Sequence, residues 1–243
     1  NAKGLSGIED NQMDCVKHLQ DLTKDEPNIE VLALKTKYPQ GAERQLIYAT
    51  TGRAINSKML PADAGCIVDN VETVISIYRA VAEGKPLTSR VVTITGQAIT
   101  DPKNFLAPIG MNFNELIEAA GGYKSEPEKL ISGGPMMGFA MYSTDCPVTK
   151  TSSALLAFTE DEVSKYAETA CINCGRCVSV CPSRIVPSRL ADYSQNGVPE
   201  LFEKWEGLEC IECGSCSFVC PAKRPLAQAI RSMKKTVIAS KRK

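Results

Sequence analysis

Two copies of one cysteine motif constrain this chain more than any other feature. The eight cysteines of the two copies are Cys171, Cys174, Cys177 and Cys181, then Cys210, Cys213, Cys216 and Cys220. In each copy two residues separate the first three cysteines, three residues precede the fourth, and a proline follows it directly. The copies superimpose at an offset of 39 residues, which also matches Gly175 with Gly214 and Val180 with Val219. The region therefore contains an internal duplication with one site per copy.

The spacing of these cysteines indicates iron–sulfur clusters. Three closely spaced thiolates allow one loop to bind three irons of a cubane, and the run is typical of bacterial two-cluster ferredoxins, in which the fourth cysteine binds the other cluster. The expected ligands of the first [4Fe–4S] cluster are Cys171, Cys174, Cys177 and Cys220. Those of the second are Cys181, Cys210, Cys213 and Cys216. The pattern predicts a chain that carries electrons.

A zinc-stabilised interaction module is the alternative from a different class. Structural zinc sites usually take separated pairs of cysteine or histidine, which this spacing does not match. The lone histidine, His18, lies away from the motifs and gives no support to acid–base catalysis. Equal numbers of acidic and basic residues, 28 of each, argue against nucleic-acid binding. The cysteines outside the motifs are scattered, as expected in a reducing compartment.

Residues 1–85 alternate helix and strand signals and predict an α/β domain. A helix is expected from Asn11 with Cys15, Leu19 and Leu22 on its buried face, followed by a strand over 29–34 and a turn over 37–41. A further helix is expected to open at Asp69, with Glu72 completing a capping box. Its apolar face comprises Val71, Val74, Tyr78 and Val81.

The rest of the chain divides into three parts. Residues 86–131 predict a small α+β module whose helix is capped by Asn112 and Glu115. Residues 132–160, rich in Gly, Ser, Thr and Pro, are expected to be a connector, and residues 161–243 a mainly helical domain. The eight basic residues of the 223–243 tail are interpreted as solvated charge. No apolar run reaches the roughly 18 residues that cross a bilayer.

Several further motifs resemble those of the RnfC family, the C subunits of Rnf-type ion-translocating electron-transport complexes, and the resemblance covers nearly the whole chain. They are Lys37–Gly41 (KYPQG), Leu60–Asp63 (LPAD), Asp69–Thr73 (DNVET) and Ser132–Gly138 (SGGPMMG), together with the cysteine runs. The resemblance implies that residues 1–85 are part of a flavin- and NADH-binding α/β domain and that residues 86–131 form a β-grasp domain of the SLBB type. The C-terminal region would be the two-cluster ferredoxin domain.

By the same resemblance, six residues are candidate FMN contacts: Tyr38, Gly41, Glu43, Asp69, Asn70 and Thr73. Relatives in respiratory complex I carry two adjacent acids where this chain has Ala42 and Glu43, so Glu43 matches that pattern only in part. Turn and cap chemistry alone also accounts for Tyr38 and Asn70.

The family carries a glycine-rich nucleotide-binding loop ahead of these motifs, and nothing like it precedes Asn11. We therefore expect an N-terminally truncated fragment that binds NADH weakly or not at all by itself.

The resemblance implies a subunit of an NAD:ferredoxin oxidoreductase that passes electrons between NADH, FMN and ferredoxin-linked carriers. Its partners would be the membrane subunits of an Rnf-type complex and ferredoxin, on the cytoplasmic face of the cell membrane. A flavoprotein cobalamin reductase of a microcompartment has a similar arrangement and is the alternative within the same class.

Overall fold

The computed structural model describes residues 2–241, and the chain divides into two compact units between Asp69 and Asn70. The first unit contains a short α/β arrangement. Its strands and helices are β1 (Gly4–Glu9), α1 (Met13–Thr23), β2 (Ile29–Leu34) and α2 (Glu43–Thr51), with 3-10 turns at Asp10–Gln12 and Pro61–Ala64.

Strands β1 and β2 are parallel and joined by α1, the connection expected of α/β proteins. The predicted strand over 29–34 is confirmed, and a helix lies where one was expected. The predicted buried face of α1 is wrong, because Val16 is its buried residue while Cys15 is exposed and Leu22 is 64% exposed. A sheet of two strands is narrow, so it covers only the stripe of the helix around Val16.

The second unit opens with helix α3 (Val71–Ala82), whose N-cap is Asn70. The Asn70 side-chain oxygen accepts a hydrogen bond from the Glu72 N–H at 2.9 Å. The predicted capping box from Asp69 to Glu72 is therefore wrong, since the helix begins one residue later and Glu72 cannot close the box. The Glu72 carboxylate instead accepts bonds from Arg90 Nη2 at 2.9 Å and from the Val91 N–H at 2.7 Å.

The bonds of Glu72 join α3 to the sheet that follows. Both side chains of the Glu72–Arg90 pair are largely buried, with exposed fractions of 25% and 15%.

We expect Glu72→Gln to weaken the first turn of α3 by about 2 kcal/mol, because hydrogen bonds to a charged partner contribute more than neutral ones. Hydrogen exchange of residues 71–82 measures this loss. Glu83→Gln, at the solvent-exposed pair with Lys85, is the control and should change exchange little.

The apolar face predicted for α3 is present but exposed. Val71, Val74, Tyr78 and Val81 keep 70%, 53%, 62% and 83% of their surface. The predicted apolar face is therefore open to solvent in the described structure. The helix meets the sheet of its own unit through Glu72 rather than through these side chains.

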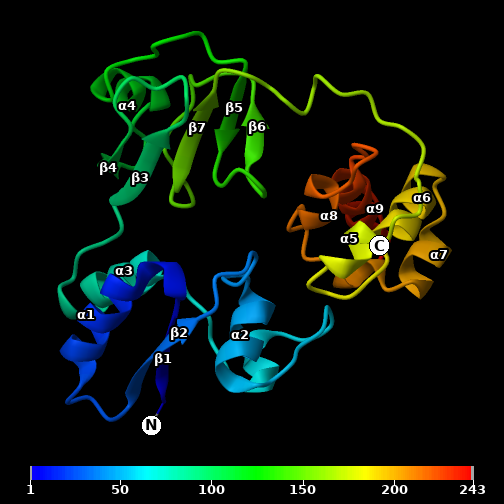
Figure 1. Ribbon diagram of the computed structural model, residues 1–243. Helices are drawn as coiled ribbons and strands as arrows, with labels where there is room; N and C mark the ends of the chain where they lie inside the picture. Colours follow the sequence, from blue (N-terminus) through cyan, green and yellow to red (C-terminus); the bar gives the residue numbers. More distant parts are fainter. Residues whose placement is uncertain (1, 242–243) are drawn as a thin grey trace. The chain divides into compact units, whose positions relative to one another are not determined.

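A five-stranded mixed sheet follows, in the order β4-β3-β7-β5-β6 (Figure 1). Its elements are β3 (Ser89–Thr95), β4 (Lys103–Pro108), α4 (Phe113–Ala119), β5 (Lys129–Ser132), β6 (Phe139–Met141) and β7 (Ala154–Phe158). Strands β3 and β7 are parallel, while β4 pairs with β3 and β5 with β7 in the antiparallel sense. The expected α+β module is confirmed.

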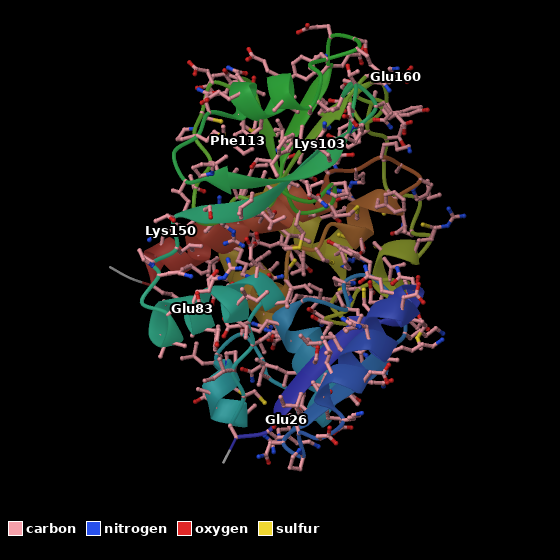
Figure 2. The ribbon with its side chains drawn as sticks, turned by 90° about the vertical axis from the view of Figure 1, so that its left-hand side faces the viewer. Glu26, Glu83, Lys103, Phe113, Lys150 and Glu160 are labelled. Atoms are coloured by element: carbon pink, nitrogen blue, oxygen red, sulfur yellow. The ribbon has the colours of Figure 1, made fainter. Side chains whose placement is uncertain are left out.

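Helix α4 covers this sheet and closes its core. The predicted box is confirmed, because Asn112 accepts from the Asn114 N–H at 2.9 Å and donates its own N–H to Glu115 at 3.0 Å. Figure 2 shows Phe113 between the helix and the strands, where it is 2% exposed. Further core residues come from the helix and its C-terminal end and from the inward positions of β3 and β7: Val92, Ile94, Leu116, Ile117, Ala120, Leu155 and Ala157.

The stretch over residues 132–160, expected to be a connector, supplies β6 and β7. Strand β7 even lies at the centre of the sheet, with Leu155 and Ala157 fully buried. This expectation is therefore wrong over 139–158. The strand is only five residues long and follows directly on a run of Thr and Ser residues, so the composition of the whole stretch gave no strand signal.

The C-terminal part is helical, as predicted, and is gathered into one group in Figure 1. Its helices are α5 (Arg176–Ser179), α6 (Pro187–Gln195), α7 (Pro199–Lys204), α8 (Ser215–Phe218) and α9 (Leu226–Ser240), with a 3-10 turn at Gly207–Glu209. Leu190, Phe202 and Ile230 are fully buried where α6, α7 and α9 meet. None of the helices within residues 2–241 is both long and apolar enough to cross a lipid bilayer.

Candidate metal centres

The internal duplication extends to backbone conformation. Asn173 and Gly175 have φ of 55° and 75°, and their counterparts Glu212 and Gly214 have 59° and 82°. A left-handed conformation is uncommon in residues with a side chain, so its recurrence at the offset of 39 indicates a shared loop design. Such turns direct successive N–H groups toward the inside of a loop, where they can face negatively charged ligands.

The first cavity lies at the first motif and has a volume of about 220 Å³. Four cysteines line it: Cys171, Cys174, Cys177 and Cys220. Cys171 and Cys174 are exposed, so this cavity is open to solvent on one side. Cys220 comes from the second motif, so both copies of the motif contribute cysteines to the wall of this cavity.

The second cavity is narrower, at about 20 Å³, and is lined by Cys181, Cys210, Cys213 and Cys216. Cys213 and Cys216 are only 7% and 9% exposed. Here the fourth cysteine comes from the first motif. The structure thus groups the eight cysteines into the two sets expected as ligands, and their binding of iron stays a prediction.

Burial favours the protonated form of three thiols of the second cavity, Cys181, Cys210 and Cys216. It raises the pKa of Cys210 to about 11 and that of Cys216 to about 12, and it raises the pKa of Cys181 as well. Metals bind the thiolate rather than the thiol, so any metal entering this site must displace protons.

The donor set fits a [4Fe–4S] cluster at each cavity. Among residues 2–241 no three His, Cys, Asp or Glu side chains are arranged to hold one metal ion. The four thiols of each set instead surround a cavity, and thiolates are the ligands that iron–sulfur clusters use. At each site a glycine with positive φ follows the second cysteine directly, at Gly175 and Gly214, so no side chain crowds the loop there.

An apolar layer separates the two cavities. Ala191, Cys216 and Leu226 form a buried cluster, and Cys177 and Cys220 pack against it. One cysteine of the second set and two of the first therefore contact the same few side chains. The sites are close neighbours with water excluded between them.

The motif Ser132–Gly138 contacts the second site. A Cβ atom placed on Gly214 would lie 3.0 Å from the Met136 carbonyl oxygen, and Arg231 stacks over the Phe139 ring at 4.8 Å. This part of the sheet module therefore lies against the loop that carries Cys213.

Charged side chains surround both sites, and sequence reasoning missed the most buried of them. Arg224 is 8% exposed and donates to Asp192 at 2.7 Å and to Gln195 at 3.0 Å. Its assignment to a solvated basic tail is wrong, as is that of Lys234, which donates to the Cys210 carbonyl at 2.6 Å. The internal repeat could have identified Arg224, because this residue occupies the position at which the first copy has the apolar Ile185.

The candidate flavin contacts are divided between the two units. Tyr38 is 47% exposed in the turn before α2, Gly41 faces open space, and Glu43 is the first residue of α2. Asp69 ends the first unit, while Asn70 caps α3 and Thr73 lies in its first turn. The structure gives Asn70 a capping role, and flavin binding by these residues stays a prediction.

Three family models match successive parts of the chain. They are the Nuo51 FMN-binding domain over residues 1–79, the SLBB domain over 91–140 and the 4Fe-4S dicluster domain over 170–225. Their order is the order of the α/β, sheet and helical parts described above.

The chain is also similar to three curated proteins. It is 46% identical over 241 residues to the C subunit of the Na(+)-translocating ferredoxin:NAD(+) oxidoreductase complex of Acetobacterium woodii, covering 99% of this chain and 54% of that protein. It is 48% identical over 233 residues to the proton-translocating counterpart of Clostridium ljungdahlii, covering 96% and 51%. It is 40% identical over 208 residues to the C subunit of the ion-translocating oxidoreductase complex of Vibrio cholerae, covering 84% and 26%.

The chain thus spans about half the length of the first two relatives and about a quarter of the third. Within that span the similarity runs through all three matched domains. The chain belongs to the RnfC family, the C subunits of the Rnf-type ion-translocating oxidoreductase complexes.

Proposed function

We propose that this chain carries electrons between NADH and FMN on one side and ferredoxin-linked carriers on the other, as part of the RnfC subunit of an ion-translocating NAD:ferredoxin oxidoreductase. The observation that carries the proposal is the grouping of eight cysteines into two adjacent four-thiol sets, each drawn from both motifs. Bound [4Fe–4S] clusters supply one-electron carriers, and FMN supplies the conversion of a two-electron hydride into single electrons.

The residues of the chain provide binding, insulation and spacing. The cysteines hold the two groups, and the left-handed turns at Asn173 and Glu212 shape the loops around them. The layer that contains Ala191 and Leu226 keeps water from the space between the sites. No acid or base is needed for electron transfer, which agrees with the position of His18 on α1, outside both cavities.

The proposal extends to the partners of the relatives. The names of those relatives describe complexes that translocate Na⁺ or protons, which supports membrane subunits and ferredoxin as partners. We place the chain peripherally on the cytoplasmic face of the membrane, with Tyr38, Gly41, Glu43, Asp69, Asn70 and Thr73 as flavin-side residues. Matches over nearly the whole chain to members of the RnfC family favour this function over a cobalamin reductase.

Anaerobic reconstitution with iron and sulfide tests the proposal. We expect about eight iron atoms and eight acid-labile sulfides per chain, with a visible absorbance that dithionite bleaches. Zinc bound without sulfide would contradict the proposal. Adding FMN and NADH then shows whether the chain also accepts electrons from the nicotinamide. Bleaching by NADH would overturn the expectation that this chain alone binds it weakly.

A further inference from the structure

The internal repeat makes Arg224 and Ile185 equivalent, and the two sites differ in character at this position. Arg224 lies in the wall of the first cavity, and Ile185, 39 residues earlier, lies in the wall of the second. Each follows its Cys-Pro pair at the same distance, and each is buried, with 8% and 7% exposure. A charged hydrogen-bond donor in one site thus replaces an aliphatic side chain in the other.

Neighbouring side chains fix the orientation of Arg224. Its Nη2 atom donates to Asp192 and to Gln195, which holds one edge of the guanidinium on α6. The Nη1 atom is buried and has no hydrogen-bond partner within the described chain. The Asp192 carboxylate raises the pKa of Arg224, and the nearby Cys171 sulfur contributes less. The guanidinium therefore lies within reach of the Cys171 sulfur, which belongs to the first set of cysteines.

A buried donor without a partner is costly, so native structures rarely leave one unmatched. Nη1 belongs to a residue that lines the cavity with four cysteines, and its other nitrogen is already engaged. A sulfur-bearing group held by those cysteines would provide the missing acceptor.

The charges at the second site have a different arrangement. The repeat counterparts of Asp192 and Gln195 are Arg231 and Lys234. Both pair with Glu212, at 2.9 Å and 3.6 Å, and Lys234 also donates to the Cys210 carbonyl. The residues that line the second cavity are cysteine, serine, glycine, proline or aliphatic. Its cations are thus neutralised outside the cavity.

The first site is also the more exposed to solvent of the two. Cys171 and Cys174 of the first site are exposed, whereas Cys213 and Cys216 of the second are buried. Reduction of a cluster adds one negative charge, which donors, cations and water stabilise and an apolar wall does not. The hydrogen-bond donor of Arg224, its positive charge and the solvent exposure of Cys171 and Cys174 therefore all favour the reduced state at the first site.

We propose that Arg224 donates a hydrogen bond from Nη1 to a sulfur of the group bound at the first site and thereby raises its reduction potential above that of the second site. This inference rests on the proposed function. Each reduction adds one electron and leaves Arg224 protonated before and after, so the guanidinium acts as a positioning and tuning residue. The first site is then reduced first, and electrons run from the second site to the first.

The test is a redox titration of the anaerobically reconstituted chain with dithionite as the reductant, followed by electron paramagnetic resonance. In the unchanged chain we expect two distinct potentials. Arg224→Lys should lower the higher potential alone, so that at a fixed potential the ratio of reduced to oxidised first site falls about tenfold, or about 59 mV. Arg224→Gln removes the charge as well and should give at least this shift.

Lys223→Gln is the matched control. Lys223 is the neighbour of Arg224 in the sequence, and the substitution removes one positive charge from an exposed side chain that lies outside the cavity. It should leave both potentials in place, since exposed charges are screened. Cys177→Ser and Cys216→Ser assign the two potentials by perturbing one site each. Asp192→Asn tests whether the anchor of Arg224 is needed for the shift.

The possible outcomes separate this inference from the proposed function. If the role of Arg224 is merely structural, its substitution should lower the content of iron and sulfide per chain or shift the potentials of both sites together. Unchanged potentials in both Arg224 variants, or an equal shift in Lys223→Gln, would overturn the inference while leaving two clusters in place. Failure of the unchanged chain to take up sulfide would contradict the proposed function itself.

Discussion

Replacing Cys181 with alanine should remove the bound group of the second site and leave that of the first, although Cys181 belongs to the first motif. The reason is its position in the wall of the second cavity with Cys210, Cys213 and Cys216. A cluster that loses one of four thiolates in a buried site has no water-accessible substitute ligand. Iron and acid-labile sulfide per chain should fall to about half, and the titration should retain only the potential of the first site.

Cys220→Ala is the reciprocal variant and should spare the second site while removing the first. Cys15→Ala serves as the control, since this exposed cysteine lies on α1 outside both cavities. If Cys181→Ala instead eliminates the signal that Cys177→Ser perturbs, each motif binds its own cluster and the grouping of the cavities does not describe the ligands.

The sequence predicted features whose cause is local or repeated. The helix capped by Asn112 and Glu115 was predictable because both bonds of the box arise within four residues. The cysteine groups were predictable because one motif occurs twice and its spacing carries chemical meaning. Strand β2 was predictable from its apolar run between turn signals.

Features that depend on distant partners were not predictable. The carboxylate of Glu72 fits a capping box by spacing, but Arg90 and the Val91 N–H compete for it from another element. Strand β7 gains its central place from pairing with β3 and β5, which precede it in the sequence and are separated from it by other elements. Arg224 looked like one charge in a basic tail, and only its contacts with Asp192 and Gln195 place it inside the first site.

The sheet module should fail if Gly96 is replaced with alanine. Gly96 has φ of 121°, and a Cβ atom there would lie 2.1 Å from the Ala157 carbonyl oxygen on β7. Backbone atoms cannot move aside as a flexible side chain can, so the central strands β3 and β7 must separate. We expect a loss of about 4 kcal/mol, from strain at positive φ combined with the clash. Hydrogen exchange of residues 89–95 and 154–158 in the full chain should then accelerate by on the order of 1000-fold.

Gly110→Ala isolates the conformational part of this loss. Gly110 also has positive φ, at 97°, but a Cβ atom there would meet nothing within 4 Å. Its cost should stay near about 1 kcal/mol, because only the left-handed strain remains. Equal effects of the two substitutions would show that the β3–β7 contact tolerates a side chain. Gly96→Ala could also disturb the second site in addition to its larger effect on stability. The contacts of Met136 with Gly214 and of Phe139 with Arg231 would explain that result, because separation of the strands would weaken both contacts.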